Sequence, residues 1–494
     1  MMIKNMIVIA GLILLASCNH GDERPNILVL MSDNQYWEHL GVNGDHSVRT
    51  PHIDSVARKG TRFQHAFCAA PSCTPSRAAF LTGQDIWRLE EGANLWGTLP
   101  AKFKTYVDLL EESGYSAGFQ GKGWGPGEYG PGGRSRNPGG NKYDSFEAFL
   151  KKASADKPWT YWFSSRHPHR PFQQGAGAAS GIDPGKIKLP SYLPDTDSVR
   201  SDIADYYAAV ESFDTEVGEI LRTLKEKGQY DNTVIVICSD NGWQMPRGLA
   251  NLYDFGSRVP LIISYAGWSQ QERVLEDFVN LYDLAPTFLD LAQTPIPGEF
   301  TAKSLLPLLL SDKEAGRVDA SRDAVFMARE RHAYARKSGE GYPGRAIRTD
   351  GFLYIRNYEP GRWPAGDPPL YGDVDAHMLH YSSPTKVEVI QSEKRPDSIF
   401  FRLAFAKRPA EELYDLAKDK DQLHNLADDR NYTVQKEKLV QRLDAYLLQT
   451  GDPRATGGPV IWDTAPYYND RDKSPRPDAT YRKLLELDSL YQYN

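Results

Sequence analysis

One short segment places a thiol near an anion-binding side chain, Cys73-Thr74-Pro75-Ser76-Arg77. Because Pro75 suits the first turn of a helix, Cys73 is predicted to lie just before a helix N-terminus, where unpaired N–H groups and the helix dipole favour anions. Arg77 adds a permanent charge whose planar fork suits tetrahedral oxyanions. The segment therefore indicates a thiol beside an anion site. The alternative is a buried cysteine and a surface arginine on an ordinary helix.

Two acid–amide pairs follow predicted strands. The apolar run 26–31 ends in Asp33-Asn34, and the run 233–238 ends in Asp240-Asn241. Short continuous apolar runs are typical of strands buried on both faces of a parallel sheet, and ligand sites in open α/β sheets lie beyond the carboxyl ends of strands. Four oxygen-bearing side chains gathered there would suit a hard cation, and we favour calcium. The alternative is that these residues only begin turns.

Two further segments place reactive side chains after predicted strands. Lys122 follows the strand 115–119 in a glycine-rich turn, where the backbone can approach a ligand closely. The buried strand 158–163 leads into a segment with His167 and His169. Since histidine titrates near neutral pH, it is suited to proton transfer. Both segments are candidate parts of a site.

The cysteine segment, with the trailing Leu81-Thr82-Gly83, resembles the signature of the type I sulfatases. The resemblance extends from about residue 25 to residue 430. It implies an α/β fold like that of the alkaline phosphatase superfamily, with a large mixed-sheet domain and a smaller C-terminal α+β domain. It also implies that a sulfatase-maturing enzyme oxidises Cys73 to formylglycine, whose hydrated aldehyde is the nucleophile.

The same resemblance implies roles for the other candidates. Arg77 and Lys122 would hold the sulfate group, and His169, with His167 as second choice, would protonate the leaving group. Asn34 stands where a second aspartate is usual and lowers the charge of the calcium site. Trp124 stands where a histidine that acts as a base is usual. The implied calcium ligands are Asp33, Asn34, Asp240 and Asn241.

Later segments most resemble the branch that contains the heparan N-sulfatases. They are Met-Pro-Arg at 245–247 with Asn-Leu-Tyr at 251–253, Glu-Arg-His at 330–332 and Tyr-Pro-x-Arg at 342–345. The resemblance implies that Arg247, His332 and Arg345 bind substrate. At position 249 a leucine stands where Lys or Arg is usual.

The implied substrate is a sulfated amino sugar of a glycosaminoglycan-type glycan, with N-sulfoglucosamine first. One alternative is an O-sulfate ester hydrolase acting on another sulfated glycan. Others are a phosphoesterase of the same superfamily, which usually needs histidine-rich zinc ligands, and a Cys73/His169 thiol hydrolase. A non-catalytic glycan-binding lipoprotein of the cell envelope is the non-enzyme alternative.

Apolar periodicity predicts the elements that position these residues. Helices are predicted over 105–114, 205–227 and 434–448, and residues 345–358 alternate like an edge-type strand. The predicted domains are a catalytic α/β domain over 19–344 and a C-terminal α+β subdomain with a tail over 345–494.

Residues 1–18 are predicted to be a lipoprotein signal peptide. Lys4 precedes an apolar run at 7–15 that is too short to span a bilayer. The run leads into Leu-Ala-Ser-Cys, which looks like a bacterial lipobox with Cys18 as the lipidated residue. The expected location is the bacterial cell envelope, periplasmic or outer-membrane, with a lipid anchor in the membrane. A plain secretory signal is the alternative.

The composition is that of a globular protein, with 40% hydrophobic and 25% charged residues among 494. The formal net charge is −7, so no global basic field attracts polyanions. We therefore expect no nucleic-acid partner, and an acidic oligosaccharide substrate would be held by local Arg and Lys. The chain has four cysteines, of which Cys18 is predicted to be lipidated and Cys73 to be oxidised. The two that remain do not form a disulfide framework.

Overall fold

The structure is a computed structural model that describes residues 24–154, 156–268, 272–374, 383–395 and 399–473. The predicted signal peptide and Cys18 lie outside these residues. No helix within the described part of the chain is both long and apolar enough to cross a membrane.

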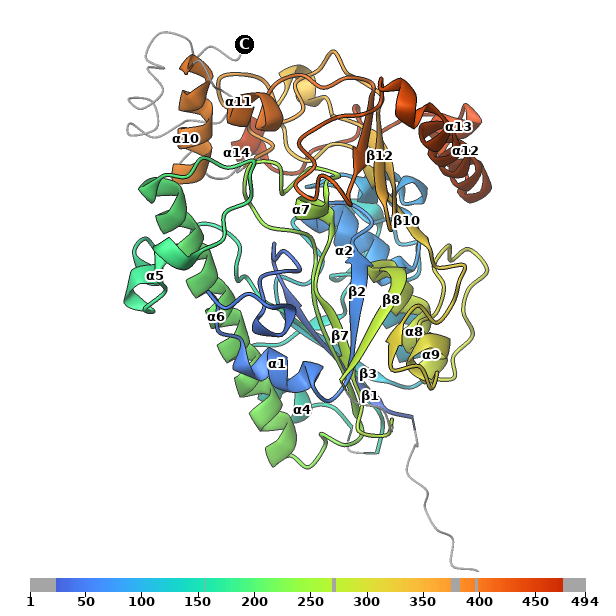
Figure 1. Ribbon diagram of the computed structural model, residues 1–494. Helices are drawn as coiled ribbons and strands as arrows, with labels where there is room; N and C mark the ends of the chain where they lie inside the picture. Colours follow the sequence, from blue (N-terminus) through green and yellow to red (C-terminus); the bar gives the residue numbers. More distant parts are fainter. Residues whose placement is uncertain (1–23, 155, 269–271, 375–382, 396–398, 474–494) are drawn as a thin grey trace, which may run out of the picture.

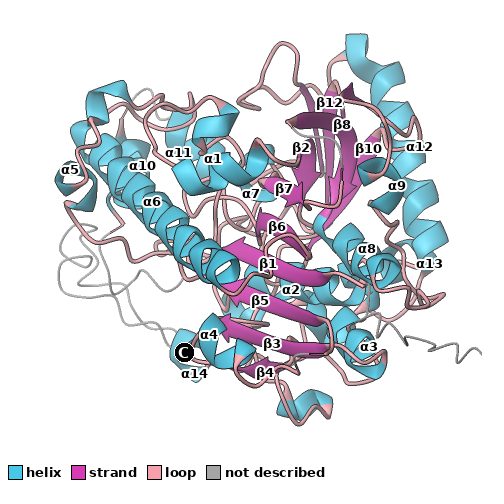
Figure 2. Cartoon of the chain, turned by 90° about the horizontal axis from the view of Figure 1, so that it is seen from below, coloured by secondary structure: helices cyan, strands magenta, loops and turns pink. Residues whose placement is uncertain are grey.

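A nine-stranded sheet forms the centre of the molecule, in the order β4-β3-β5-β1-β6-β7-β2-β8-β9 (Figures 1 and 2). Every pairing is parallel except the two made by β7, so the sheet is mixed, as predicted. The strands are β1 (Asn26–Ser32), β2 (Thr61–Phe67), β3 (Ser116–Gly121), β4 (Asn141–Lys142), β5 (Trp159–Ser164), β6 (Thr233–Ser239), β7 (Leu261–Ser264), β8 (Arg273–Asn280) and β9 (Ala315–Gly316).

Helices cover both faces of this sheet, which explains why its central strands are apolar throughout. In β1, Ile27 and Val29 belong to the core cluster formed with α2 (Cys73–Thr82), α3 (Tyr106–Glu112) and α8 (Leu284–Leu291). Leu28 and Leu30 belong to the cluster formed with α1 (Pro51–Ala57) and α6 (Asp197–Glu226) on the other face (Figure 2). The helix predicted over 205–227 begins earlier than predicted, at Asp197. Thr196 caps it by accepting a hydrogen bond from the backbone amide of Val199.

A second, four-stranded antiparallel sheet has the order β10-β11-β12-β13 and stands above the ends of β2 and β8 in Figure 1. Its strands are β10 (Ala324–Arg329), β11 (Gly344–Thr349), β12 (Phe352–Asn357) and β13 (Glu411–Asp415), and α12 (Thr433–Thr450) contacts β11 and β12. The prediction of one edge-type strand over 345–358 is wrong, because this segment is a hairpin whose two strands lie inside the sheet. The smaller sheet begins at Ala324, before the predicted boundary at residue 345.

The other helices are short and lie in the connections. They are α4 (Phe146–Leu150), α5 (Ala176–Ala179), α7 (Asp254–Ser257), α9 (Leu306–Leu309), α10 (Pro384–Gln391), α11 (Ile399–Ala404), α13 (Pro453–Thr456) and α14 (Asp470–Lys473).

Candidate active site

The cysteine segment forms the first turn of α2, at the sheet edge where the parallel strands end. Cys73 is the first helical residue, Ser72 is the extended N-cap residue, and all ten residues of the helix are buried. The helix follows β2 through a short connection, so the carboxyl end of a central strand delivers the thiol to this edge. Cys73 is 4% exposed, so it is almost fully enclosed.

The two acid–amide pairs meet because β1 and β6 are parallel neighbours in register. Ser32 pairs with Ser239, so the next residues, Asp33 and Asp240, lie side by side. Sγ of Cys73 lies 3.5 Å from Oδ1 of Asp33 and 3.8 Å from Oδ1 of Asn34. Ligand atoms of Cys73, Asp33 and Asp240 all lie within 4.8 Å of one another.

Two cations pair with the carboxylates of this cluster. Nε of Arg77 lies 2.8 Å from Oδ2 of Asp240, and Nζ of Lys122 lies 2.7 Å from Oδ2 of Asp33. Burial by itself would raise the pKa of Asp33, but the charges of Lys122, His169 and Arg77 outweigh it and hold this pKa well below its usual range. At Asp240 burial dominates over the attraction of Arg77, so its pKa is raised.

The oxygen set of the cluster fits a hard cation. Oδ1 of Asn241 is buried without a hydrogen-bond partner among the described residues, which suits an atom that binds a cation. The amide nitrogen of Asn34 donates to Oε1 of Gln244 at 3.0 Å, which turns Oδ1 of Asn34 toward Cys73. Two carboxylates and two amide oxygens are ligands that calcium accepts in proteins.

Asn34 adopts a left-handed backbone conformation with a φ of 69°. Asparagine tolerates this region better than most side chains do. The backbone N–H of Asn34 donates to Oδ1 of Asp240 at 3.0 Å, so the turn after β1 is tied to the end of β6. Asn34, which stands where an aspartate is usual, therefore lies in a turn that a hydrogen bond to Asp240 fixes.

Two histidines approach the cluster from different elements. His169 lies close enough to Asp33 to help lower the pKa of its carboxyl group, and its Nδ1 contacts the backbone carbonyl of Arg170. His167 instead lies near Glu216 of α6, where burial raises the pKa of that carboxyl group and the charge of His167 opposes this only in part. Nδ1 of His332 lies 2.8 Å from the hydroxyl oxygen of Ser72. The structure therefore brings His332 to the Cys73 segment and His169 to the neighbourhood of Asp33, and it directs His167 elsewhere.

The other two predicted substrate contacts have partners outside the cluster. Arg247 is buried over the ring of Tyr253, and its guanidinium donates to backbone carbonyls of Leu403 and Gln422. Arg345 is fully buried between Glu330 and Asp452, at 2.8 and 2.6 Å. Neither guanidinium contacts the Cys73 cluster in the described part of the structure.

Trp124 does not take over the role of the usual histidine as a base, because it is 2% exposed and belongs to the main hydrophobic core. Arg134 and Arg136, in the loop after it, pair with Asp108 and Glu111 of α3.

Sequence reasoning missed three positioning residues. Ser164 accepts from Nη1 of Arg77, Gln244 orients Asn34, and Ser72 meets His332. Ser164 ends β5, so the strand-end rule that found Asp33 would have found it too.

Comparisons with known proteins agree with this geometry. Residues 25–127 and 141–294 match the family model "Sulfatase", and residues 247–363 match "N-sulphoglucosamine sulphohydrolase, C-terminal". The chain is 28% identical to human N-sulphoglucosamine sulphohydrolase, across 87% of this chain and 91% of the relative. It is 26% identical to an ulvan-active sulfatase of Formosa agariphila, across 87% and 81%.

Solved structures share the fold. One, described as in complex with its substrate D-glucosamine-2-N,6-O-disulfate, is 18% identical with a TM-score of 0.64, covering 87% of this chain and 98% of that one. A phosphonate monoester hydrolase of Agrobacterium radiobacter is 19% identical with a TM-score of 0.61, covering 86% and 96%.

Proposed function

The chain belongs to the sulfatase family and hydrolyses a sulfate ester or sulfamate of a sulfated glycan, and we propose that its substrate is a sulfated amino sugar of the glycosaminoglycan type, N-sulfoglucosamine first. The observation that carries the proposal is the meeting of Cys73, Arg77 and Lys122 around Asp33 and Asp240. The match of residues 247–363 to the C-terminal model of N-sulphoglucosamine sulphohydrolase supports N-sulfoglucosamine as the sugar of the substrate.

Calcium and formylglycine both fit this site. Calcium held by Asp33, Asn34, Asp240 and Asn241 would supply positive charge that polarises oxygen ligands and lowers the pKa of a bound hydroxyl. Formylglycine made from Cys73 by a maturing enzyme would supply the nucleophilic hydroxyl. Burial raises the pKa of the unmodified Cys73 thiol well above its usual range. The thiolate that a cysteine hydrolase needs is therefore disfavoured.

The protein's own side chains bind the sulfate group and handle the proton. The charges of Arg77 and Lys122 compensate those of the sulfate oxygens. Nη2 of Arg77 lies 3.7 Å from Oδ1 of Asp33 and has no hydrogen bond among the described residues, so it is available as a donor. His169 donates a proton to the departing nitrogen of a sulfamate or the departing oxygen of an ester.

Two observations bear on the alternatives. The ligand set of aspartates and asparagines favours calcium over the histidine-bound zinc of related phosphoesterases. An O-sulfate ester hydrolase is the second candidate, because the relatives include ulvan-active sulfatases and Leu249 is buried where a basic residue is usual.

The expected place of action is the bacterial cell envelope, with Cys18 carrying a lipid anchor. An enzyme held there would act on imported sulfated oligosaccharides.

The decisive experiment measures sulfate release from N-sulfated, 6-O-sulfated and 3-O-sulfated glucosamine, as monosaccharides and disaccharides, with Cys73→Ala as the control. Release from the N-sulfated sugar is the expected result. Release from esters alone would overturn the N-sulfatase assignment and keep the sulfatase activity. Absence of release from every sugar would favour the glycan-binding lipoprotein.

A further inference from the structure

Arg170 follows the proposed acid His169 in the sequence and is 3% exposed. Its guanidinium group forms two parallel bonds to the carboxylate of Asp202 in α6, from Nη1 at 2.7 Å and from Nη2 at 2.6 Å. A bidentate pair of this kind fixes the relative orientation of the two side chains. The long helix α6 therefore holds the side chain of Arg170 in one place.

Asp202 is held from a second side by α10. The hydroxyl group of Thr385 donates to Oδ2 of Asp202 at 2.6 Å, and the backbone N–H of Thr385 donates to the same oxygen at 3.3 Å. Asp202 is 5% exposed and Thr385 is fully buried. We call Arg170, Asp202 and Thr385 the Arg170 clamp, because their bonds join the segment after β5 to α6 and α10.

The backbone of Arg170 reaches a predicted calcium ligand through Gln244. The N–H of Arg170 donates to Oε1 of Gln244 at 3.1 Å, and Nε of Arg170 donates to the backbone carbonyl of Gln244 at 3.2 Å. Oε1 of Gln244 also accepts a bond from Nδ2 of Asn34 at 3.0 Å. Since an amide group carries its nitrogen and oxygen on opposite sides, fixing Nδ2 of Asn34 also fixes the direction of Oδ1.

The carbonyl group of Arg170 meets the imidazole of His169. Nδ1 of His169 contacts this carbonyl oxygen. Because a carbonyl oxygen only accepts hydrogen bonds, the neutral ring carries its proton on Nδ1. Nε2 is then the atom that gains and gives up the second proton. The place of the Arg170 carbonyl thus sets both the orientation of the His169 ring and the nitrogen that serves as the acid.

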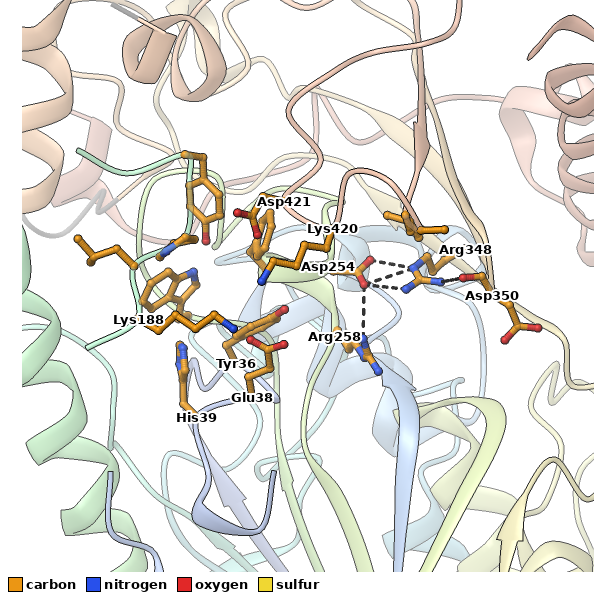
Figure 3. A pocket seen from close by; sticks show the side chains of 17 residues that line it. Tyr36, Glu38, His39, Lys188, Asp254, Arg258, Arg348, Asp350, Lys420 and Asp421 are labelled. Carbon is orange, nitrogen blue, oxygen red and sulfur yellow. Dashed lines mark hydrogen bonds and ion pairs between the residues drawn. The ribbon is translucent and has the colours of Figure 1, made fainter. Parts of the chain in front are cut away.

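Aromatic packing encloses the Arg170 clamp. Cζ of Arg170 lies 4.2 Å from the ring centroid of Phe172, and the rings of Phe172 and Tyr206 lie 5.7 Å apart. Tyr206 in turn contacts Trp243, which lines the pocket of about 270 Å³ that Figure 3 shows. No residue of the clamp is among the lining residues of this pocket. The clamp is therefore packed between elements and acts through the residues that it holds.

We propose that Arg170 is a positioning residue that fixes the proposed acid His169 and the predicted calcium ligand Asn34 relative to each other. Its carbonyl oxygen holds the His169 ring and its N–H holds Gln244, while the ion pair with Asp202 keeps the backbone of Arg170 in place. Since a buried ion pair adds little net stability, the contribution of this pair is the geometry that it fixes. The inference rests on the proposed hydrolysis of a sulfate group with His169 as the acid.

Calcium affinity tests the link to Asn34 without turnover. Calorimetry on chelator-treated protein compares the parent with Asp202→Asn and with Arg170→Lys, which keeps the charge and loses the two parallel bonds. Both variants should bind calcium about fivefold more weakly. The control Arg322→Lys disrupts a buried ion pair of similar exposure, 2.9 Å from Asp283, and should bind calcium like the parent.

The protonation of His169 tests the second link by nuclear magnetic resonance. In protein with ¹⁵N-labelled histidine, the His169 signals, identified by their loss in His169→Gln, should show a neutral ring protonated on Nδ1. Asp202→Asn should shift the ring toward protonation on Nε2, and Arg322→Lys should leave it unchanged. At saturating calcium, Asp202→Asn should lower kcat for N-sulfoglucosamine about tenfold and change KM less than about twofold.

Either link can fail on its own. Parent-like calcium affinity in both clamp variants, or a His169 ring whose protonation does not respond to Asp202→Asn, would overturn the proposal. If these variants do not fold, Thr385→Val removes the hydroxyl bond to Asp202 at nearly constant volume and should produce smaller shifts in the same directions. Both responses in a protein that releases no sulfate would retain the Arg170 clamp and overturn the proposed function.

Discussion

The hydroxyl oxygen of Ser72 lies 2.8 Å from Nδ1 of His332, so the N-cap residue of α2 is bonded to the segment that follows β10. A serine at this position usually caps its own helix, but the Ser72 side chain makes no such bond. The backbone of Ala328 also donates to the carbonyl of Ala69 at 2.9 Å. The C-terminal sheet and the segment after β10 thus fix the connection between β2 and α2, which leads to Cys73.

We predict that His332 is a positioning residue for Cys73. His332→Ala should lower kcat about tenfold or more, because the residue before the nucleophile loses its fixed partner. His332→Asn, whose amide can keep a bond to Ser72, should recover part of the activity. Sulfate-release kinetics check this, with mass spectrometry confirming equal formylglycine content.

Ser72→Ala provides the matched test of the same bond. If the pair acts as a unit, the double variant with His332→Ala loses little more activity than either single variant. Additive losses would contradict the coupling.

Cys73 is predicted to be formylglycine in enzyme made in a host with a maturing enzyme. Mass spectrometry of the tryptic peptide that ends at Arg77 should show the conversion, and Cys73→Ala should lower sulfate release about a thousandfold or more. Fully active enzyme with an unmodified thiol would refute this and favour a thiol hydrolase.

Calcium should bind at the ends of β1 and β6 and depend on Gln244. Gln244→Ala removes the acceptor that directs the amide of Asn34, so calcium affinity should fall severalfold. Gln244→Glu keeps this acceptor and should bind calcium like the parent. Asp240→Ala should lose both calcium and turnover, measured by metal analysis and sulfate release. Full activity after exhaustive chelation would contradict the site.

Stability should fall as pH rises because of Asp85, which is 1% exposed and accepts a hydrogen bond from Tyr446 at 2.9 Å. Burial raises the pKa of Asp85 to about 7, against about 4 in an unfolded chain. Folding therefore favours the protonated acid, and its stabilising contribution is complete below about pH 4 and is lost as pH rises through about 7.

Asp85→Asn should remove this dependence while keeping an acceptor for Tyr446. Relative to the parent, the variant should gain stability between pH 5 and pH 8, on the order of a few kcal/mol. Thermal unfolding of both proteins at each pH checks this. A difference in Tm that does not change with pH would contradict it.

Local sequence was sufficient where a residue's place follows from its own strand. Apolar runs ending in polar residues predicted β1 and β6, and parallel neighbours bring such ends together, so the meeting of Asp33 and Asp240 could be expected. The hairpin over 345–358 was also within reach, because Asp350-Gly351 separates its strands and is a strong turn signal. Reading the segment as one strand overlooked that pair.

The sequence by itself determined the residue types at the site, the strand ends that carry them and the family to which the chain belongs. Only the tertiary structure decided which charges meet. Arg345 pairs with Asp452, and Ser72 meets His332 260 positions away. The residue type alone does not show whether an arginine or histidine faces a buried carboxylate or a ligand. That choice depends on packing between two sheets, which no local pattern contains.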